Sequence, residues 1–421
     1  MLIYKEIVSK DNITLAYFEV VDKFDKTLKS FRYSGIDAKK INDFDFYSKD
    51  LIGVARRELL EFREPDTALK IKIPKKNKPE DRTVFIHTVK ERVKNQAIYR
   101  VIEPIFDKYF SNFLYSYRQS HPHYEAIKSA AKRYRREKDT DYILIGDISN
   151  YSDNMDKAIL RKKIKEIGLG NQTEKLLDLY IDNTYSEKGV VICPKVGVIT
   201  GLPVTVLFNN LYLDEIDKYI GKKVSLYRRV GDDFIIFDKS LTKIEEINKY
   251  LSEKLVTLMI PKNQQKISIL KANTPFKFLG YKFSDGKISI NDSSLRKILI
   301  RWKNKLKYYP ISTKIKLRRL KKILFEQDPI HNDFIEIINQ YNQTNDIEQI
   351  KKMSNYFYRK LTIYFFGKYS KRNQRLVAEL TANLNIPSFL GYYKKIHTGR
   401  QSLSEIRESK KVRSAPENET L

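Results

Sequence analysis

Cysteine is nearly absent from this sequence of 421 residues, which contains one, Cys193. One thiol forms neither a disulfide framework nor a cysteine-built zinc site, and such scarcity is typical of reducing compartments. Cys193 is expected to be a small buried residue. Long apolar runs are absent too, because none approaches the roughly 20 residues that cross a bilayer. The first residues, MLIYKEIVSKDN, lack the apolar stretch of a signal peptide. We therefore expect a cytoplasmic protein with no membrane partner.

Acidic residues are outnumbered, with 52 Asp and Glu against 80 Lys and Arg and a net charge of +28. An excess of this size predicts a polyanionic partner, nucleic acid first and a membrane surface second. Hydrophobic residues make up 41% of the chain and aromatic residues 12%, which is enough for a large core. Residues 295–325 hold twelve Lys and Arg and no acid, and we expect these cations to contact phosphates.

The hydrophobic pattern mixes helices with short strands. The runs LKIKI and TVFI flank the polar KKNKPED and predict a hairpin, and apolar residues four apart then predict a helix over residues 89–116. DYILIGDIS reads as a buried strand, and VSLYRR and FIIF flank Val-Gly-Asp-Asp in a second hairpin. Between them, Pro203 is suited to the first turn of a helix over 203–219. Short strands are expected near KISIL, FKFLGYKF and KISI. This order predicts an α+β protein with a small antiparallel sheet.

Three acids occupy unusual places in this pattern. Asp147 ends the apolar strand, and Asp232 and Asp233 lie at the tip of the second hairpin. Carboxylates that converge from separate strands raise one another's pKa unless a cation neutralises them, and hard divalent ions take oxygen ligands of this kind. Two Mg²⁺ ions held about 3.5–4 Å apart would activate a 3′-hydroxyl and stabilise a leaving pyrophosphate. The alternative is that Asp-Asp only serves the turn after Gly231.

The segments around these acids resemble those of bacterial reverse transcriptases, over roughly residues 55–370. DISNYSD resembles the family's first aspartate motif, and RRVGDDFIIF resembles its catalytic hairpin. TGLPVTVLFNNLYLDEID is similar to the segment beside template and incoming nucleotide, NQQK to the next motif, and FLGY to the primer-grip turn. PKKNKPEDRTVFIHTVKERV and YSYRQSHPHYEAIKSA resemble two segments further upstream. Its size and divergent motifs are most similar to those of the unknown-group and abortive-infection reverse transcriptases.

The resemblance implies the right-hand architecture of a polymerase, with fingers, a palm made of a small antiparallel sheet flanked by helices, and an α-helical thumb. Residues 1–60 would form an N-terminal extension, 61–135 the fingers, and 136–290 the palm with fingers insertions. Residues 291–395 would form the basic helical thumb, and 396–421 a polar tail. The thumb is expected to hold the duplex by its backbone with little reading of sequence.

The resemblance also implies roles for individual residues. Asp147, Asp232 and Asp233 are expected to be catalytic and to bind metal together with Ile148. The residues expected at the nucleotide site are Arg82, Tyr151, Ser152, Thr200, Gly201, Leu202, Pro203 and Lys266, with Arg82 and Lys266 as candidates for the triphosphate. The residues expected to grip the primer are Phe278, Leu279, Gly280 and Tyr281. The thumb residues expected to bind nucleic acid are Arg301, Lys303, Lys307, Arg318 and Arg319.

One departure from the family's pattern concerns the choice of sugar. The family has a bulky aromatic residue five positions after the first aspartate, where it excludes a ribose 2′-hydroxyl. This chain has Ser152 at that position and Tyr151 one residue earlier. Use of ribonucleotides therefore stays open, and so does a local shift that lets Tyr151 act as the gate.

Other departures point in the same direction. Val230-Gly231 stands where the family has Tyr-Ala, Thr200 where it has Gln, and Asn209 where it has Ala. The series Thr200, Gly201, Thr205 and Asn209 resembles a motif of RNA-dependent RNA polymerases. Against that similarity, the second acid of the viral enzymes, five residues after the first, is missing here.

The resemblance implies an RNA-directed DNA polymerase that uses deoxynucleoside triphosphates and the two-metal mechanism, with Mg²⁺ as cofactor and Mn²⁺ as a substitute. It implies a role in bacterial antiviral defence, with an RNA template or structured non-coding RNA, a DNA product, and a homo-oligomer or neighbouring defence protein as further partners. We find no ribonuclease H, endonuclease, protease or integrase region in these residues. Alternatives that stay open are a polymerase that accepts ribonucleotides or works without template or from a protein primer, a retron-type enzyme, and a non-catalytic RNA-binding scaffold.

Overall fold

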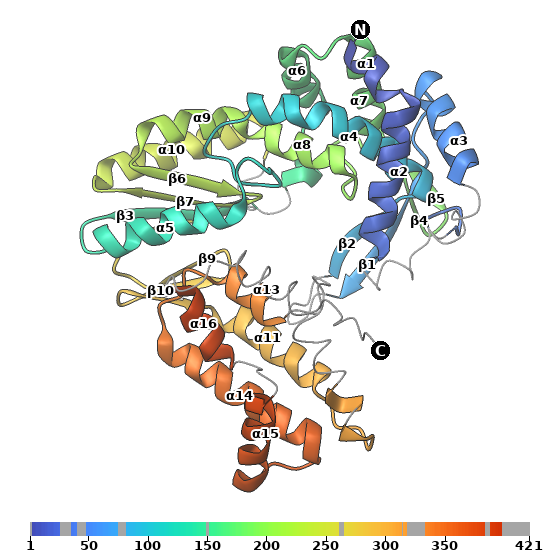
Figure 1. Cartoon of the computed structure of the whole chain (residues 1–421). Coiled ribbons are helices and arrows are strands. Elements are labelled where there is room, and N and C mark those ends of the chain that lie inside the picture. Colours follow the sequence, from blue (N-terminus) through green and yellow to red (C-terminus); the bar gives the residue numbers. More distant parts are fainter. Residues whose placement is uncertain are drawn as a thin grey trace, which may run out of the picture. The chain divides into compact units, whose positions relative to one another are not determined.

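The structure is a computed structural model that describes residues 2–25, 35–39, 48–74, 81–148, 151–260, 265–313, 315–317, 333–383 and 388–397. The chain divides into two compact units, Met1–Ala272 and Asn273–Leu421 (Figure 1). Each unit combines helices with a small sheet, which confirms the α+β fold class. No helix within the described ranges is long and apolar enough to cross a bilayer.

A four-stranded antiparallel sheet lies within the first unit, in the strand order β6-β7-β3-β8. Its strands are β3 (Tyr142–Ile148), β6 (Leu226–Val230), β7 (Asp233–Asp238) and β8 (Gln265–Lys271). β7 is buried from its second residue to its last, as its continuous apolar run predicts. The predicted strand at DYILIGD and the predicted hairpin at Val-Gly-Asp-Asp are therefore confirmed.

Three helices pack directly on this sheet. α10 (Leu241–Thr257) packs on β3 and β7, and α5 (His123–Glu137) and α9 (Asp214–Lys223) pack on β6 (Figure 1). The buried residues of α10 are Ile244, Ile247, Leu251 and Leu255, spaced three or four apart on one helical face. The apolar spacing that predicts a helix here is thus also what gives α10 the face that packs on the sheet.

The chain after the Gly-Leu-Pro segment forms two helices. α8 (Pro203–Tyr212) begins at Pro203 as expected, but α9 (Asp214–Lys223) follows after a break at Leu213. The prediction of one helix over 203–219 was therefore wrong. The break lets Asp214 accept a hydrogen bond of 2.7 Å from the backbone N–H of Ser111, which ties α9 to a distant loop.

The long helix α4 (Val89–Tyr109) ends earlier than the sequence indicates. Residues 113–115 instead run beside β6 and bond to its backbone, because Tyr115 donates to the Arg229 carbonyl at 2.8 Å and Arg229 donates to Phe113 at 3.0 Å. The predicted helix over 89–116 was therefore too long. The loop that follows α4 adds to the edge of the sheet that carries the Asp-Asp turn.

The first sixty residues are part of this unit's core. Helices α1 (Leu2–Ile7), α2 (Lys10–Asp25) and α3 (Ser48–Leu60) all pack on α4. Ile7, Ile13 and Ala16 are fully buried in the same apolar cluster as the β7 residue Phe234. Helices α6 (Lys157–Ile167) and α7 (Asn171–Ile181) complete the unit.

A second sheet of the first unit has the strand order β2-β1-β4-β5. Its strands are β1 (Ala68–Pro74), β2 (Asp81–Ile86), β4 (Tyr185–Glu187) and β5 (Val190–Ile192). The antiparallel pairing of β1 with β2 confirms the first predicted hairpin, whose tip, residues 75–80, lies outside the described residues. Cys193, just after β5, is exposed, so the expectation that it is buried was wrong.

The second unit begins with a three-stranded meander of β9 (Phe276–Phe278), β10 (Tyr281–Ser284) and β11 (Lys287–Ile290). Its helices are α11 (Asp292–Lys305), α13 (Asp333–Gln340), α14 (Ile347–Phe366), α15 (Lys371–Asn383) and α16 (Phe389–His397). Trp302 packs edge-on against Phe334, Phe357 and Phe389 at ring-centroid distances of 5.2–5.8 Å. The predicted boundaries of fingers, palm and thumb stay a prediction, and most of the predicted tail, 398–421, lies outside the described residues.

Candidate active site

The three candidate acids come together where β3 meets the β6–β7 hairpin. Asp147 of β3 lies directly opposite Asp233, the first residue of β7. Residues paired in this way share one face of the sheet, with Cβ atoms about 4.5–5.5 Å apart. Asp232 belongs to the turn, and its carbonyl accepts a hydrogen bond of 3.0 Å from the N–H of Ile148. Strands far apart in the sequence thus place three carboxylates side by side.

Two glycines shape this corner of the sheet. Gly146, next to Asp147, lies under the ring of Phe234, and a Cβ at this position would be 2.6 Å from that ring. Gly231 has φ +67°, a left-handed conformation that glycine adopts without steric cost. A Cβ at Gly231 would meet no atom within 4 Å, so the turn requires its backbone conformation and not its small size.

The acids raise one another's pKa. Burial, followed by the Asp232 and Asp147 carboxylates, raises the pKa of Asp233 to about 7. Burial and Asp147 also raise the pKa of Asp232, while the guanidinium groups of Arg229 and Arg82 act in the opposite direction. Like charges crowded in this way are stabilised by a cation, as the sequence predicts.

The carboxylates fit a hard divalent cation in their chemistry, since oxygen ligands are what Mg²⁺ and Mn²⁺ prefer. Among the described residues, however, no group of three or more His, Cys, Asp or Glu side chains is arranged so that it could hold a metal ion. The carboxylates that the backbone brings together are those of β3 and the turn, and the side chain of Ile148 is apolar and buried, so a ligand from this residue would be its backbone carbonyl. Asp147, Ile148, Asp232 and Asp233 as metal ligands therefore stay a prediction.

The Gly-Leu-Pro loop is fastened to the end of β2. His87, which follows β2 and is buried, donates from Nε2 to the Thr200 carbonyl at 3.0 Å, because a carbonyl only accepts. Gly201 has φ +106°, and a Cβ there would lie 3.1 Å from the Phe85 carbonyl. Leu202 is buried, and α8 starts at Pro203. The four predicted loop residues thus form a rigid corner against the β1–β2 hairpin.

The two candidate triphosphate ligands lie on strands β2 and β8. Arg82 is exposed on β2, and its charge acts on Asp232. Lys266 of β8 is the backbone partner of Asp147, and its side chain lies outside the described structure. The sequence motifs around both residues therefore converge on the acids, while their contact with a nucleotide stays a prediction.

The two candidates for the sugar gate, Tyr151 and Ser152 of the DISNYSD segment, differ in environment. Tyr151 is 5% exposed, and its hydroxyl donates to the Asn209 carbonyl at 3.1 Å. Burial raises the pKa of this hydroxyl to about 12. The place of Tyr151 in the nucleotide site stays a prediction. Ser152 is half-buried, and its carbonyl accepts from the N–H of Val198 at 3.0 Å.

The predicted primer grip is a tight turn in the second unit. Leu279 and Gly280 both have positive φ, 43° and 87°, and join β9 to β10. Phe278 and Tyr281 are buried, and the Tyr281 hydroxyl donates to the Gln340 carbonyl at 2.8 Å. The predicted turn is present, and contact of these four residues with a primer stays a prediction.

The predicted nucleic-acid contacts of the thumb are partly visible. Lys303 and Lys307 are exposed at the end of α11, whereas Arg301 pairs with Glu336 at 3.1 Å. Arg318 and Arg319 lie outside the described residues. Phosphate contact by these cations stays a prediction.

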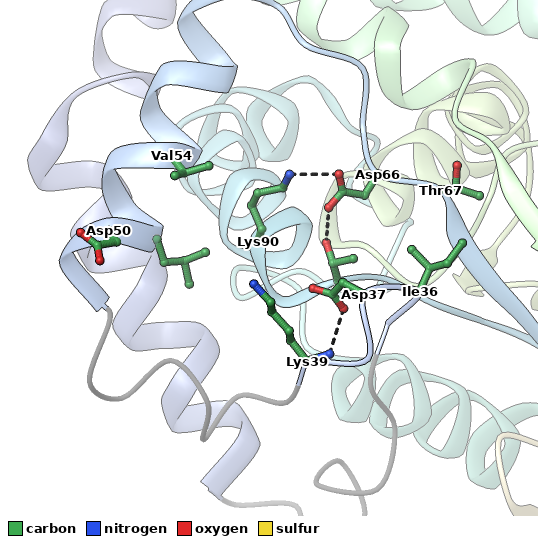
Figure 2. A pocket seen from close by; sticks show the side chains of 10 residues that line it. Ile36, Asp37, Lys39, Asp50, Val54, Asp66, Thr67 and Lys90 are labelled. Atoms are coloured by element: carbon green, nitrogen blue, oxygen red, sulfur yellow. Dashed lines mark hydrogen bonds and ion pairs between the residues drawn. The ribbon is translucent and has the colours of Figure 1, made fainter.

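A pocket of about 800 Å³ lies elsewhere in the first unit. Its lining residues are Ile36, Asp37, Lys39, Asp50, Leu51, Val54, Asp66, Thr67, Thr88 and Lys90. Figure 2 shows Lys90 paired with Asp66, at 3.0 Å, and Asp66 bonded in turn to the hydroxyl of Thr88. None of the predicted site residues lines this pocket.

Four residues near the acids were not singled out by the sequence analysis. His87 supports the Gly-Leu-Pro loop, and Ser116, Asp217 and Arg229 surround the Asp-Asp turn. Asp217 and Arg229 lie inside quoted motifs, where a charged residue in a largely apolar run is a signal for a buried pair. No such signal marks His87 or Ser116.

Comparison with known proteins agrees with this geometry. Residues 73–283 match the family described as reverse transcriptase (RNA-dependent DNA polymerase), and these residues are half of the chain. The chain belongs to the reverse transcriptase family. It is therefore an RNA-directed DNA polymerase, a nucleotidyltransferase.

Two curated relatives are similar at low identity. Protein YkfC of Escherichia coli K12 is 23% identical over 267 residues, which cover 54% of this chain and 70% of YkfC. The group II intron-encoded protein LtrA of Lactococcus lactis subsp. cremoris is 24% identical over 161 residues, which cover 37% of this chain and 26% of LtrA. The chain thus spans about a quarter of the length of LtrA.

Two telomerase structures are also similar. Telomerase from Candida albicans, solved with a fragment of telomeric RNA, gives a TM-score of 0.43 at 12% identity and covers 88% of this chain and 70% of its own. Apo telomerase from Candida tropicalis gives 0.48 at 11% identity and covers 80% and 64%. Similarity at this level adds nothing to the family assignment.

The buried imidazole of His87 predicts a loss of stability in acid. Burial lowers its pKa to about 4 in the folded protein, against about 6.5 when unfolded. The unfolded chain binds the proton first, so this group's contribution is complete above pH 6.5 and is lost as pH falls towards 4. We expect a loss of about 2 kcal/mol in the free energy of unfolding between pH 7.5 and pH 5 from this group. His87→Gln, whose amide still donates to Thr200, should lack this loss in urea unfolding curves; an equal loss in both proteins would contradict the assignment.

Proposed function

We propose that this enzyme copies an RNA template into DNA at the site formed by Asp147, Asp232 and Asp233. The primer 3′-oxygen attacks the α-phosphorus of a deoxynucleoside triphosphate, the bond between α-phosphorus and bridging oxygen breaks, and pyrophosphate leaves. Two Mg²⁺ ions, or Mn²⁺ in their place, supply activation of the hydroxyl and stabilisation of the leaving group when bound. The observation that carries the proposal is the pairing of Asp147 with Asp233 beside the Asp232 turn, with raised pKa values that a cation would lower.

The remaining roles are assigned from position. We propose that Arg82 and Lys266 bind the triphosphate, because the charge of Arg82 acts on Asp232 and Lys266 is the backbone partner of Asp147. The loop of Thr200 to Pro203 would shape the nucleotide pocket, since Gly201 lets backbone approach a ligand closely. The Leu279-Gly280 turn would hold the primer end, and exposed thumb cations such as Lys303 would bind the duplex backbone. The single cysteine supports a reducing compartment, the cytoplasm.

Asp232→Asn tests the catalytic assignment. The amide keeps the shape of the side chain but removes a charge, so we expect primer extension to fall about a thousandfold, equivalent to several kcal/mol of transition-state stabilisation. The measurement is extension of a primed RNA template with Mg²⁺ and deoxynucleoside triphosphates. Asp139→Asn is the matched control, because Asp139 is an exposed acid just before β3, paired with Lys138 and outside the candidate site. Full activity in a double Asn variant at 232 and 233 would show that the acids are not catalytic.

A second candidate function, synthesis with ribonucleotides, is favoured by one observation. The Tyr151 ring is buried and its hydroxyl is bonded to the Asn209 carbonyl, so this ring is not available as a sugar gate. The residue at the usual gate position is Ser152, which is too small to exclude a 2′-hydroxyl. We propose that the enzyme accepts ribonucleoside triphosphates besides its deoxy substrates.

Ser152→Phe tests this candidate. We expect the ratio of ribonucleotide to deoxynucleotide incorporation to fall at least about tenfold, because an aromatic ring at this position occupies the space of the 2′-hydroxyl. Tyr151→Phe is the control, since it keeps the buried ring and should leave the ratio unchanged. Parallel reactions with each nucleotide set measure the ratio. A wild-type enzyme that incorporates no ribonucleotide would rule the candidate out.

We propose that the biological role is defence against phage, with a structured non-coding RNA as template or partner. The support is the resemblance of the divergent motifs to the unknown-group and abortive-infection reverse transcriptases. Template-independent or protein-primed synthesis and a retron-type activity are alternatives, and a homo-oligomer or neighbouring defence protein would be a further partner. Sequencing the nucleic acid that co-purifies with the protein distinguishes among these templates.

Phage plating tests the defence role. We expect bacteria that express the wild-type enzyme to reduce plaque numbers for at least one phage of a broad panel, by about tenfold or more. Cells with Asp232→Asn should plate like cells with an empty vector. Protection that persists in this variant would favour a non-catalytic RNA-binding scaffold, and equal plating throughout would remove the defence role.

A further inference from the structure

Both backbone polar groups of Gly231, the residue before Asp232, are held by side chains. Its N–H donates to the hydroxyl oxygen of Ser116, which lies in the loop after α4. Its carbonyl accepts from Nη1 of Arg229 at 2.9 Å. A turn whose glycine has open space around it has no steric contact to fix its shape. These two hydrogen bonds therefore hold the turn, together with the backbone bond from Ile148 to Asp232.

The arginine is itself held in place. Asp217 of α9 accepts from Arg229 Nε at 2.8 Å and from Nη2 at 2.6 Å, and both side chains are at most 1% exposed. The hydroxyl of Tyr227 donates to the same carboxylate at 2.6 Å. Burial acts to lower the pKa of Arg229, but Asp217 outweighs it and holds that pKa above its usual range. The guanidinium is thus charged, planar and fixed from one side while it binds Gly231 from the other.

Ser116, the second side chain that binds Gly231, is held in place by the same surroundings. Asn210 of α8 donates from its side-chain Nδ2 to the backbone carbonyl of Ser116 at 2.9 Å. The backbone carbonyl of Asn210 accepts from Arg229 Nη2 at 3.2 Å. The backbone bonds between residues 113–115 and Arg229 bring the loop against β6. Both arms that hold Gly231 therefore meet at one residue of α8.

A buried ion pair adds little stability on average, because the cost of removing both charges from water offsets their attraction. Its geometry here has a more specific result. Asp233 is paired with Asp147 and Asp232 lies beside them, so the like charges of these acids oppose the pairing of the turn with β3. The fixed guanidinium and the Ser116 hydroxyl hold the residue immediately before Asp232.

We propose that Asp217, Arg229 and Ser116 form a positioning clamp, which sets the catalytic turn so that the Asp232 carboxylate keeps its place beside Asp147. This inference rests on the proposed function, since it assigns the clamp to the chemical step. A displacement of the turn by a fraction of an ångström to an ångström would lower the rate of that step by one to two orders of magnitude. Binding of nucleotide and primer would be unaffected, because no clamp residue is among those proposed to contact them.

Ser116→Ala is the most direct test, because it removes one arm and buries no charge. We expect kcat to fall about ten- to a hundredfold with the KM for deoxynucleotide within about twofold of wild type. Hydrogen–deuterium exchange of the peptide that covers residues 226–236 should become faster. The matched control is Ser129→Ala: Ser129 accepts from Arg228 Nε at 2.8 Å, on the same strand, but does not contact the turn.

Arg229→Lys is the second variant, because lysine keeps the charge beside Asp217 but cannot bind it bidentately and reach the Gly231 carbonyl together. We expect the same fall in kcat with unchanged KM. If the wild type is active and Ser116→Ala has the same kcat, the clamp is overturned but the proposed function is not. Equal losses of kcat in Ser116→Ala and Ser129→Ala would also overturn it, as a general structural effect. A wild type that incorporates no nucleotide overturns the proposed function, and the clamp with it.

Discussion

The pairing register of β3 with β7 is the constraint on which the active site depends. Side chains alternate between the two faces of a sheet, so a slip of one residue would turn Asp147 away from Asp233. The contact between Gly146 and the Phe234 ring secures this register, because only glycine leaves room for that ring. A shifted strand would bring the side chain of Ile145 or Asp147 under the ring instead. One small residue beside one aromatic ring thus aligns acids that are more than eighty positions apart in the sequence.

The β6–β7 hairpin separates two electrostatic environments. On one side of the turn, acidic groups lie close together, and burial and mutual repulsion shift the pKa values of Asp232 and Asp233 upward. On the other side, opposite charges are matched in a dry interior, where the guanidinium of Arg229 has bonds to Asp217, Asn210 and Gly231. The crowded acids on the first side would be stabilised by a bound cation, and the matched charges on the second side favour one conformation of the hairpin.

The sequence predicted those parts of the structure that depend on local pattern. Apolar strands, the two hairpins and the acids at their ends follow from periodicity and turn chemistry, and all of them are found. The break after Tyr212 and the early end of α4 were missed because hydrogen bonds between distant residues decide them. The Ser111 N–H binds the Asp214 carboxylate, and residues 113–115 bind the backbone of Arg229. The burial of Tyr151 was likewise invisible, since its partner, Asn209, is 58 residues away. Roles that need a bound nucleotide or primer were assigned from resemblance.

Because α1, α2 and α3 pack on α4, the limit of sequence similarity to the family differs from the limit of the folded unit. Similarity to the family begins at residue 73, but the cooperative unit that carries the acids begins within the first ten residues, because Ile7 and Ile13 share one apolar cluster with Phe234. α4 supplies Asn95, which binds the N–H of Val204 at the start of α8. Truncation to residues 73–283, the segment that matches the family, would remove α1, α2 and α3 and expose the apolar face of α4 to water. For this enzyme, the limits of homology are therefore a poor guide to the limits of a foldable fragment.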